Sequence, residues 1–338
     1  MRGRVDIELN TPQIVYRMSL TRNITLVRGD SGSGKSYLCD LLRQAAANVE
    51  DVMLTLSQKV DFLVMPEVTT DPRISRSWDE IIKSCNDTII FIDETCDCLK
   101  SGVFSQVIQD TTNYYVLFSR GTHADIPYSV DSILYFDKEL SDIGPRVTSR
   151  QLRPESLATQ QLAPSLIVTE DEKAGFVIYK HMYSIPVVSA KSKTKIVKKL
   201  KSLAMQDKDG ILLVVDGAAF GAEIEKVSDL LQGLFKNSYV FMPESFEWIL
   251  LHSPVFVEVP DIEIILYKYL EIIDWSRYFS AERFFTSIIK ELTKKLGLEA
   301  YDKSVTSLDS IFLQESSLEE FRKLLPIKYY SEKTNFFS

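Results

Sequence analysis

The segment Gly29-Asp30-Ser31-Gly32-Ser33-Gly34-Lys35-Ser36 decides how the first half of this 338-residue chain folds. It fits the pattern G-x-x-x-x-G-K-[ST] at every position. The apolar run 24–27 before it predicts a buried strand, and residues 37–42 after it predict a helix. Glycines let the loop between them turn its backbone N–H groups toward phosphate oxygens, at the positive end of the helix. We therefore expect a phosphate-binding loop.

The last two residues of this segment have side chains suited to a nucleotide. Lys35 would bridge the β- and γ-phosphates, and the Ser36 hydroxyl would bind Mg²⁺. The alternative is a glycine-rich turn that fits the pattern by accident. A second motif argues against the alternative, because the apolar run 88–92 predicts a strand that ends at Asp93 and Glu94.

With both motifs, residues 1–138 resemble a P-loop ATPase, of the branch that carries a catalytic glutamate after the magnesium-binding aspartate and includes the ABC, RecA and AAA groups. The resemblance implies an α/β fold with a parallel-rich sheet, in which the strand beside the phosphate loop ends at Asp93, the magnesium ligand. It implies that Glu94 polarises the attacking water. It also places Arg120, after the apolar strand 114–118, where that branch senses the γ-phosphate. ATP and Mg²⁺ are the implied cofactors.

The lead-in to the loop is most like the ABC group, because residues 5–9 and 14–20 predict two strands around a turn at 10–12. One departure is that no LSGGQ-like signature precedes the acidic strand. His123 falls loosely where ABC proteins keep a switch histidine, although a lone histidine in a loop is more often simply solvated.

Composition is that of an ordinary globular protein, with 45% hydrophobic and 25% charged residues and a net charge of -8. The length predicts two domains. No apolar run is long enough for a membrane span and nothing resembles a signal peptide, so we expect a cytoplasmic protein without membrane contact. Cys96 and Cys98 form a C-x-C pair without a histidine partner, which is not zinc spacing and predicts reduced, structural thiols.

The pattern changes after the first domain. Residues 138–164 are polar and have no clear period, which predicts a linker or docking arm. The expected organisation is a P-loop ATPase domain at 1–138, the arm at 139–164, a second α/β domain at 165–255 and a mostly helical region at 256–338.

Three predicted strands of the second domain each end near a carboxylate. The first ends at Glu170, the second at Asp216 and the third near Glu244 and Glu247. Carboxyl ends of strands in an open α/β sheet meet in one crevice, where such groups can hold Mg²⁺ or Mn²⁺ and activate water against a phosphodiester. Solvated loop residues are the alternative.

Residues 165–250 are similar to the Toprim fold of topoisomerases, primases and the nucleases associated with overcoming-lysogenization-defect (OLD) proteins. That fold has an early glutamate, matched by Glu170, and an Asp-x-Asp motif, matched only in part by Asp216-Gly217-Ala218. Glycine does not follow the glutamate here either. The resemblance implies a metal-dependent nuclease, or a degenerate site that is catalytically silent.

Positive charge is densest in the segment from Lys191 to Lys201, which has six lysines. These lysines can contact a nucleic-acid backbone. Alternatively they form the solvated face of a helix whose Ile196, Val197 and Leu200 face the core.

Three classes of function follow. In the first, the nucleotide state controls a Toprim-like nuclease, as in bacterial or phage defence proteins that pair these domains. In the second, the chain is an ATPase motor or sensor whose second domain binds a partner protein. In the third, it is a nucleotide-dependent scaffold that forms homo-oligomers through the helical tail.

Overall fold

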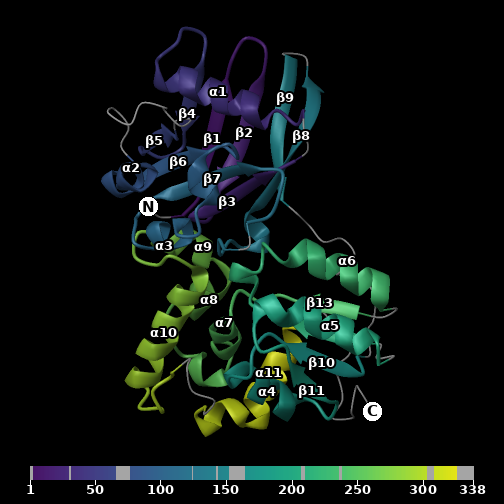
Figure 1. Cartoon of the computed structure of the whole chain (residues 1–338). Helices are drawn as coiled ribbons and strands as arrows, with labels where there is room; N and C mark the ends of the chain where they lie inside the picture. Colours follow the sequence, from purple (N-terminus) through teal and green to yellow (C-terminus); the bar gives the residue numbers. More distant parts are fainter. Residues whose placement is uncertain are drawn as a thin grey trace. The chain divides into compact units, whose positions relative to one another are not determined.

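The computed structural model describes residues 3–29, 32–65, 77–123, 125–141, 144–151, 164–206, 210–235, 238–302 and 308–325 (Figure 1). The chain forms two compact units. Unit 1 comprises Met1–Arg153 and Leu270–Ser280, and unit 2 comprises Pro154–Tyr269 and Ala281–Ser338. The architecture is α/β, with a large mixed sheet in unit 1 and a smaller parallel sheet in unit 2.

Unit 1 is built on a sheet that has nine strands within the described residues, in the order β4-β1-β2-β9-β8-β3-β7-β6-β5. The strands are β1 (Val5–Asn10), β2 (Val15–Leu20), β3 (Ile24–Arg28), β4 (Met53–Leu56), β5 (Asp61–Val64), β6 (Thr88–Ile92), β7 (Tyr114–Ser119), β8 (Ile133–Ser141) and β9 (Gly144–Gln151). From β8 to β5 every neighbouring pair is parallel. At the other end β1 pairs antiparallel with β2 and with β4.

The parallel strands in the middle of this sheet form the core of unit 1. All residues of β6 and β7, and all but the last of β3, are buried. Runs of this kind form central parallel strands, which are covered on both faces. The helices of unit 1 are α1 (Lys35–Ala46), α2 (Trp78–Ser84) and α3 (Phe104–Gln109), with short 3-10 turns η1 (Asp97–Lys100) and η2 (Val130–Ser132). A capping box between Ser77 and Glu80 starts α2.

Unit 2 contains a parallel sheet whose order is β11-β10-β12-β13 among the described residues. Its strands are β10 (Leu166–Thr169), β11 (Val187–Ser189), β12 (Ile211–Val214) and β13 (Ser238–Phe241). The helices are α4 (Ala174–Met182), α5 (Ile196–Ala204), α6 (Ile224–Leu234), α7 (Phe246–Leu250), α8 (Ile262–Tyr267), α10 (Ala281–Lys295) and α11 (Glu315–Lys323). The short helix α9 (Tyr269–Ile272) belongs to unit 1 from its second residue on. α10 packs on α7, and α11 packs on α4.

Most predicted elements are confirmed, including the strand before the phosphate loop, the helix after it and the strands of unit 2. The predicted linker is wrong in its first part. β8 and β9 form an antiparallel hairpin that reaches residue 151 and continues the large sheet, whereas residues 152–163 lie outside the described part. Residues 270–280, expected in a separate helical region, belong to unit 1, where Phe279 O accepts a 2.6 Å hydrogen bond from Asn23 Nδ2.

We expected the strand that ends at Asp93 to lie directly beside the strand of the phosphate loop, but the structure shows that it does not. β7 lies between β3 and β6 and pairs in parallel with both. The three strands still end at the same edge of the sheet because they run in the same direction. In the part of the chain that the structure describes, no helix is long and apolar enough to cross a membrane.

Candidate active site

The loop after β3 has the backbone that its glycines were expected to provide. Gly34 has φ of 94° and caps the N-terminus of α1, in a conformation that favours glycine. A Cβ added there would lie 2.9 Å from Tyr16 Oη, which itself donates to Gly34 O at 3.3 Å. Tyr16 of β2 thus packs directly against the loop. Asp30 and Ser31, two of the predicted phosphate-binding residues, lie outside the described residues.

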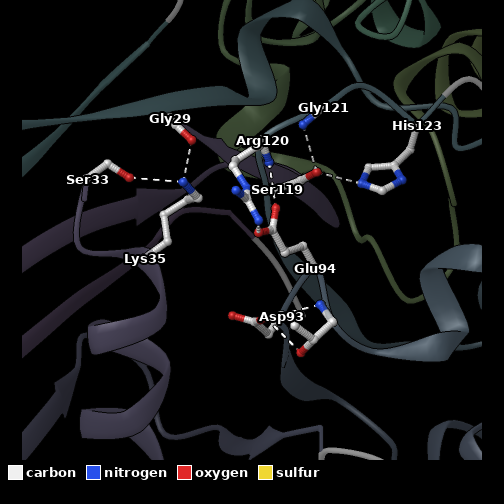
Figure 2. A network of polar contacts seen from close by, with 10 residues as sticks. Gly29, Ser33, Lys35, Asp93, Glu94, Ser119, Arg120, Gly121 and His123 are labelled. Atoms are coloured by element: carbon white, nitrogen blue, oxygen red, sulfur yellow. Dashed lines mark hydrogen bonds and ion pairs between the residues drawn. The ribbon is translucent and has the colours of Figure 1, made fainter. Parts of the chain in front are cut away.

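Lys35 begins α1 and points back over the loop (Figure 2). The residue is only 7% exposed, and its Nζ donates to Ser33 Oγ at 2.9 Å and to Gly29 O. Ser36 follows it at the helix N-terminus and is exposed. The loop therefore gathers a buried ammonium group, an exposed hydroxyl and the first N–H groups of a helix in one place.

Asp93 follows β6 and is held by its own turn. Its Oδ1 accepts hydrogen bonds from Thr95 N at 3.1 Å and Thr95 Oγ1 at 2.9 Å. Burial, together with the charge of Asp93, raises the pKa of the Cys39 thiol on the helix that follows the phosphate loop. The buried Asp93 carboxyl therefore lies within electrostatic reach of α1.

Arg120 contacts both carboxylate oxygens of Glu94, one through an ion pair and the other through its backbone N–H. Arg120 Nε donates to Glu94 Oε1 at 2.7 Å, and Nη2 lies 2.6 Å from the same oxygen. The backbone N–H of Arg120 donates to Oε2 at 3.0 Å. These hydrogen bonds lower the pKa of Glu94, and the charge of Lys35 lowers it further. Glu94 is therefore an anion at neutral pH, within the electrostatic reach of Lys35.

Ser119 and His123 complete the polar network beside Arg120 (Figure 2). Ser119 Oγ accepts from Gly121 N at 3.1 Å and lies 3.0 Å from His123 Nε2. Burial lowers the pKa of His123, although the charge of Glu94 opposes this effect. His123 is therefore neutral at pH 7 and hydrogen-bonded, unlike the solvated loop histidine that was the alternative.

Strand order explains why these groups meet. β3 carries the phosphate loop at its carboxyl end, β7 carries Ser119 and Arg120, and β6 carries Asp93 and Glu94. In the sheet, β3 lies between β7 and β8 and pairs in parallel with both strands. Open α/β sheets bind ligands at such a point, in the crevice beyond the carboxyl ends of the strands.

Unit 2 has a pocket at the carboxyl ends of β10 and β12. Glu170 and Asp216 line it together with apolar groups, among them Phe176, Phe246 and Tyr301. Asp216 N donates a long hydrogen bond of 3.5 Å to Glu170 Oε2. Burial raises the pKa of Glu170, so keeping this side chain ionised in the folded protein lowers the free energy of unfolding.

The other two predicted carboxylates are not among the residues that line this pocket. Glu247 lies on α7 and is completely buried, and its Oε1 accepts a 2.9 Å hydrogen bond from the hydroxyl of Tyr301. Glu244 follows β13, and its backbone oxygen accepts from Ala218 N at 3.3 Å. Among the described residues, no group of three or more His, Cys, Asp or Glu side chains is arranged to hold a metal ion.

The lysine-rich segment of unit 2 is only partly helical. It contains the 3-10 turn η4 (Lys193–Lys195) and the first turns of α5. Lys191, Lys195, Lys198 and Lys201 are exposed, whereas Ile196 and Leu200 are buried. This placement fits both a phosphate-contacting surface and the solvated face of a helix. The charge of Lys193 reaches Glu170 and lowers its pKa slightly against the effect of burial.

Sequence reasoning missed several groups that shape the two sites. Tyr16 and Cys39 approach the phosphate loop and Asp93 from the second strand and from α1, and Tyr301 approaches the unit 2 pocket from far along the chain. Of these groups, Thr95 had the clearest signal in the sequence, because a threonine two residues after an aspartate often donates a hydrogen bond to the aspartate side chain.

Comparison with models of known protein families gives no match, and no curated protein matches the chain. The functional argument therefore depends on the geometry of the two sites.

Proposed function

We propose that the chain binds ATP with Mg²⁺ and hydrolyses it at the carboxyl edge of the unit 1 sheet. The observation that carries this proposal is that Lys35, at the start of α1, lies within electrostatic reach of Glu94, which follows β6 together with Asp93. The loop has its left-handed glycine at the helix N-terminus, as backbone binding of phosphate requires.

The donor set at this edge suits magnesium. Ser36 offers an exposed hydroxyl and Asp93 a carboxylate, and both are hard oxygen ligands of the kind that Mg²⁺ prefers. Mg²⁺ bound there supplies positive charge against the phosphate oxygens. Lys35 adds a second positive charge from the loop side.

Glu94 is the group proposed to act on the attacking water. Its lowered pKa makes it a weak proton acceptor, so its main contribution is to orient and polarise the water toward the γ-phosphate. Arg120 fixes the direction of the carboxylate through three contacts from the end of β7. Arg120 is 62% exposed, which leaves its guanidinium accessible to phosphate charge.

The direct test is ATP binding by the Lys35→Ala variant. Loss of a charged hydrogen-bond donor should weaken binding by about 100-fold. Isothermal titration calorimetry with MgATP measures this change. Lys83→Ala is the matched control, because Lys83 pairs with Asp79 on the exposed face of α2 and should leave binding unchanged. Equal affinities for all three proteins would exclude the loop as the nucleotide site.

For unit 2 we propose, as the second candidate function, that nucleotide state controls a metal-dependent phosphodiesterase formed around Glu170 and Asp216. It is favoured by two acidic residues that line one pocket at the carboxyl ends of parallel strands, with the charge of Lys193 reaching Glu170. A nucleic acid bound along Lys191 to Lys201 would supply further oxygen ligands. This activity would suit a cytoplasmic defence protein that works as a homo-oligomer.

A catalytically silent binding module is the alternative for unit 2, and the Tyr301 contact of Glu247 favours it. Anomalous diffraction from crystals soaked in Mn²⁺ separates the two. A peak with oxygen ligands from both Glu170 and Asp216 would support the phosphodiesterase. Empty density there would leave a sensor or scaffold whose only active site is the phosphate loop.

A further inference from the structure

Two buried thiols lie directly after the carboxylates of the unit 1 site. Cys96 Sγ and Cys98 Sγ are 2.9 Å apart. Cys96 is 6% exposed and Cys98 is completely buried. Cys96 N donates to Asp93 O at 3.0 Å, so the first thiol belongs to the turn that carries Asp93 and Glu94. Neither thiol has a role in the proposed hydrolysis.

We propose that Cys96 and Cys98 are an oxidation site, at which a peroxide converts the two thiols into an intramolecular disulfide. A disulfide has its sulfurs about 2.05 Å apart, so the present separation must shrink by roughly 0.9 Å. Little chain entropy is lost on closure, because the two residues are fixed next to each other by the turn into η1. Cys96 and Cys98 are free thiols, as expected, and the proposal adds a specific reaction to them.

The low exposure of the pair selects the oxidant. An oxidant that is itself a bulky disulfide compound cannot reach a sulfur that is this deeply buried. Hydrogen peroxide can reach it, because it is nearly as small as water. Cys96 is the sulfur with some exposure and is therefore attacked first. Its thiolate sulfur bonds to one peroxide oxygen, the O–O bond breaks, and the departing hydroxide takes up a proton to become water.

The resulting sulfenic acid is resolved by the neighbouring thiol. Cys98 Sγ attacks Cys96 Sγ, the S–O bond breaks, and a second water leaves with the thiol proton of Cys98. Two thiols thus lose two electrons in total, and one peroxide becomes two waters. A disulfide within such a short segment is strained and therefore easily reduced again, as a reversible modification requires.

Oxidation should slow ATP hydrolysis, a consequence that rests on the proposed function of unit 1. Closing the disulfide moves Cys96, whose backbone N–H donates to Asp93 O. Glu94 lies between Asp93 and Cys96 in the sequence, so it belongs to the turn that the disulfide displaces. A displacement of about 1 Å in a catalytic group can cost about 100-fold in rate. We expect at least a tenfold loss of hydrolysis, recovered after dithiothreitol, while ATP binding changes less because Lys35 and its loop lie on other elements.

The test treats the folded full chain with hydrogen peroxide, alkylates the remaining thiols in denaturant and measures peptide masses. The expected product is a peptide spanning 96–98 that is about 2 Da lighter and carries no alkyl group. In Cys98→Ser the sulfenic acid at Cys96 should persist and react with dimedone when the peroxide-treated protein is unfolded in denaturant. Cys85→Ser is the control, and it should form the disulfide as readily as the wild type.

Each outcome has a distinct meaning. Alkylation of both Cys96 and Cys98 after peroxide treatment, or a bond from either to another cysteine, would overturn the oxidation site. A disulfide that leaves hydrolysis unchanged would overturn its effect on Glu94. If the reduced protein does not hydrolyse ATP at all, the proposed function of unit 1 fails, but the mass measurement still decides whether the oxidation site exists.

Discussion

At the scale of single residues, the contact between Glu94 and Arg120 governs the proposed chemistry. We predict that Arg120→Ala lowers the rate of ATP hydrolysis by at least about tenfold, because the carboxylate loses its orientation. Arg120→Lys should recover little of the lost hydrolysis rate, since lysine lacks the planar guanidinium that reaches Glu94 Oε1 through two nitrogens. Steady-state kinetics would measure both variants. Arg17→Ala removes a comparable exposed ion pair with Glu8 and serves as the control. A faster Arg120→Ala enzyme would mean that the arginine restrains Glu94 instead.

Glu170 gives a prediction that depends on pH. Its pKa is raised in the folded protein, so the folded state binds a proton more readily than the unfolded state does. Stability is therefore greatest below the unfolded pKa and falls as pH rises through the folded pKa. Glu170→Gln should melt a few degrees higher than the wild type at pH 7.5 in EDTA, and the gain should vanish below about pH 4. Glu172→Gln, at an exposed neighbouring position, should show no such pH-dependent gain.

Single residues were predictable where a motif fixes them locally. Lys35 and Glu94 lie next to strands and loops that the sequence makes plain, so their placement at one edge follows from strand direction. Glu247 was different, because it lies on a helix and the direction of its side chain depends on packing against Tyr301, 54 residues later. Only the folded chain reveals that its carboxylate points into the interior.

At the scale of elements, the turn from β3 into α1 depends on Gly34. Gly34→Ala should lower the stability by about 1–2 kcal/mol, because an L-residue resists the left-handed conformation. The added Cβ would also press on Tyr16 Oη and disturb the loop, so ATP binding should weaken. Gly102→Ala is the control, since a Cβ there meets nothing within 4 Å. Chemical denaturation and calorimetry would measure the two effects, and equal behaviour of the variants would contradict this account of the turn.

Elements with a strong apolar period were predictable, and those without one were not. β6 and β7 are completely buried, and their apolar runs predict them as strands. β4 alternates between exposed and half-buried residues, and β5 is only half-buried, so neither produces a clear pattern. The part of the β8–β9 hairpin after residue 138 was predicted as a linker, because β9 is polar and contains Pro145.

At the scale of the whole molecule, the proposed control of unit 2 by nucleotide predicts a response in both units. Saturating MgATP should slow amide hydrogen exchange around the loop and α1 in unit 1, and should change exchange along Leu166–Thr169 and Ile211–Val214 in unit 2. ATP at 100 times its dissociation constant stabilises the binding unit by about 2.7 kcal/mol. Lys35→Ala should abolish both responses. A response confined to unit 1 would rule out the coupling and leave the ATPase without a controlled partner unit.

The measurement that tests the central claim most directly is ATP hydrolysis by Glu94→Gln, compared with the wild type and with the exposed control Glu50→Gln. The variant keeps the shape of the side chain but loses its charge. We predict that Glu94→Gln binds MgATP as tightly as the wild type and hydrolyses it at least about 100-fold more slowly. Hydrolysis by Glu94→Gln at the wild-type rate would contradict the assignment of Glu94.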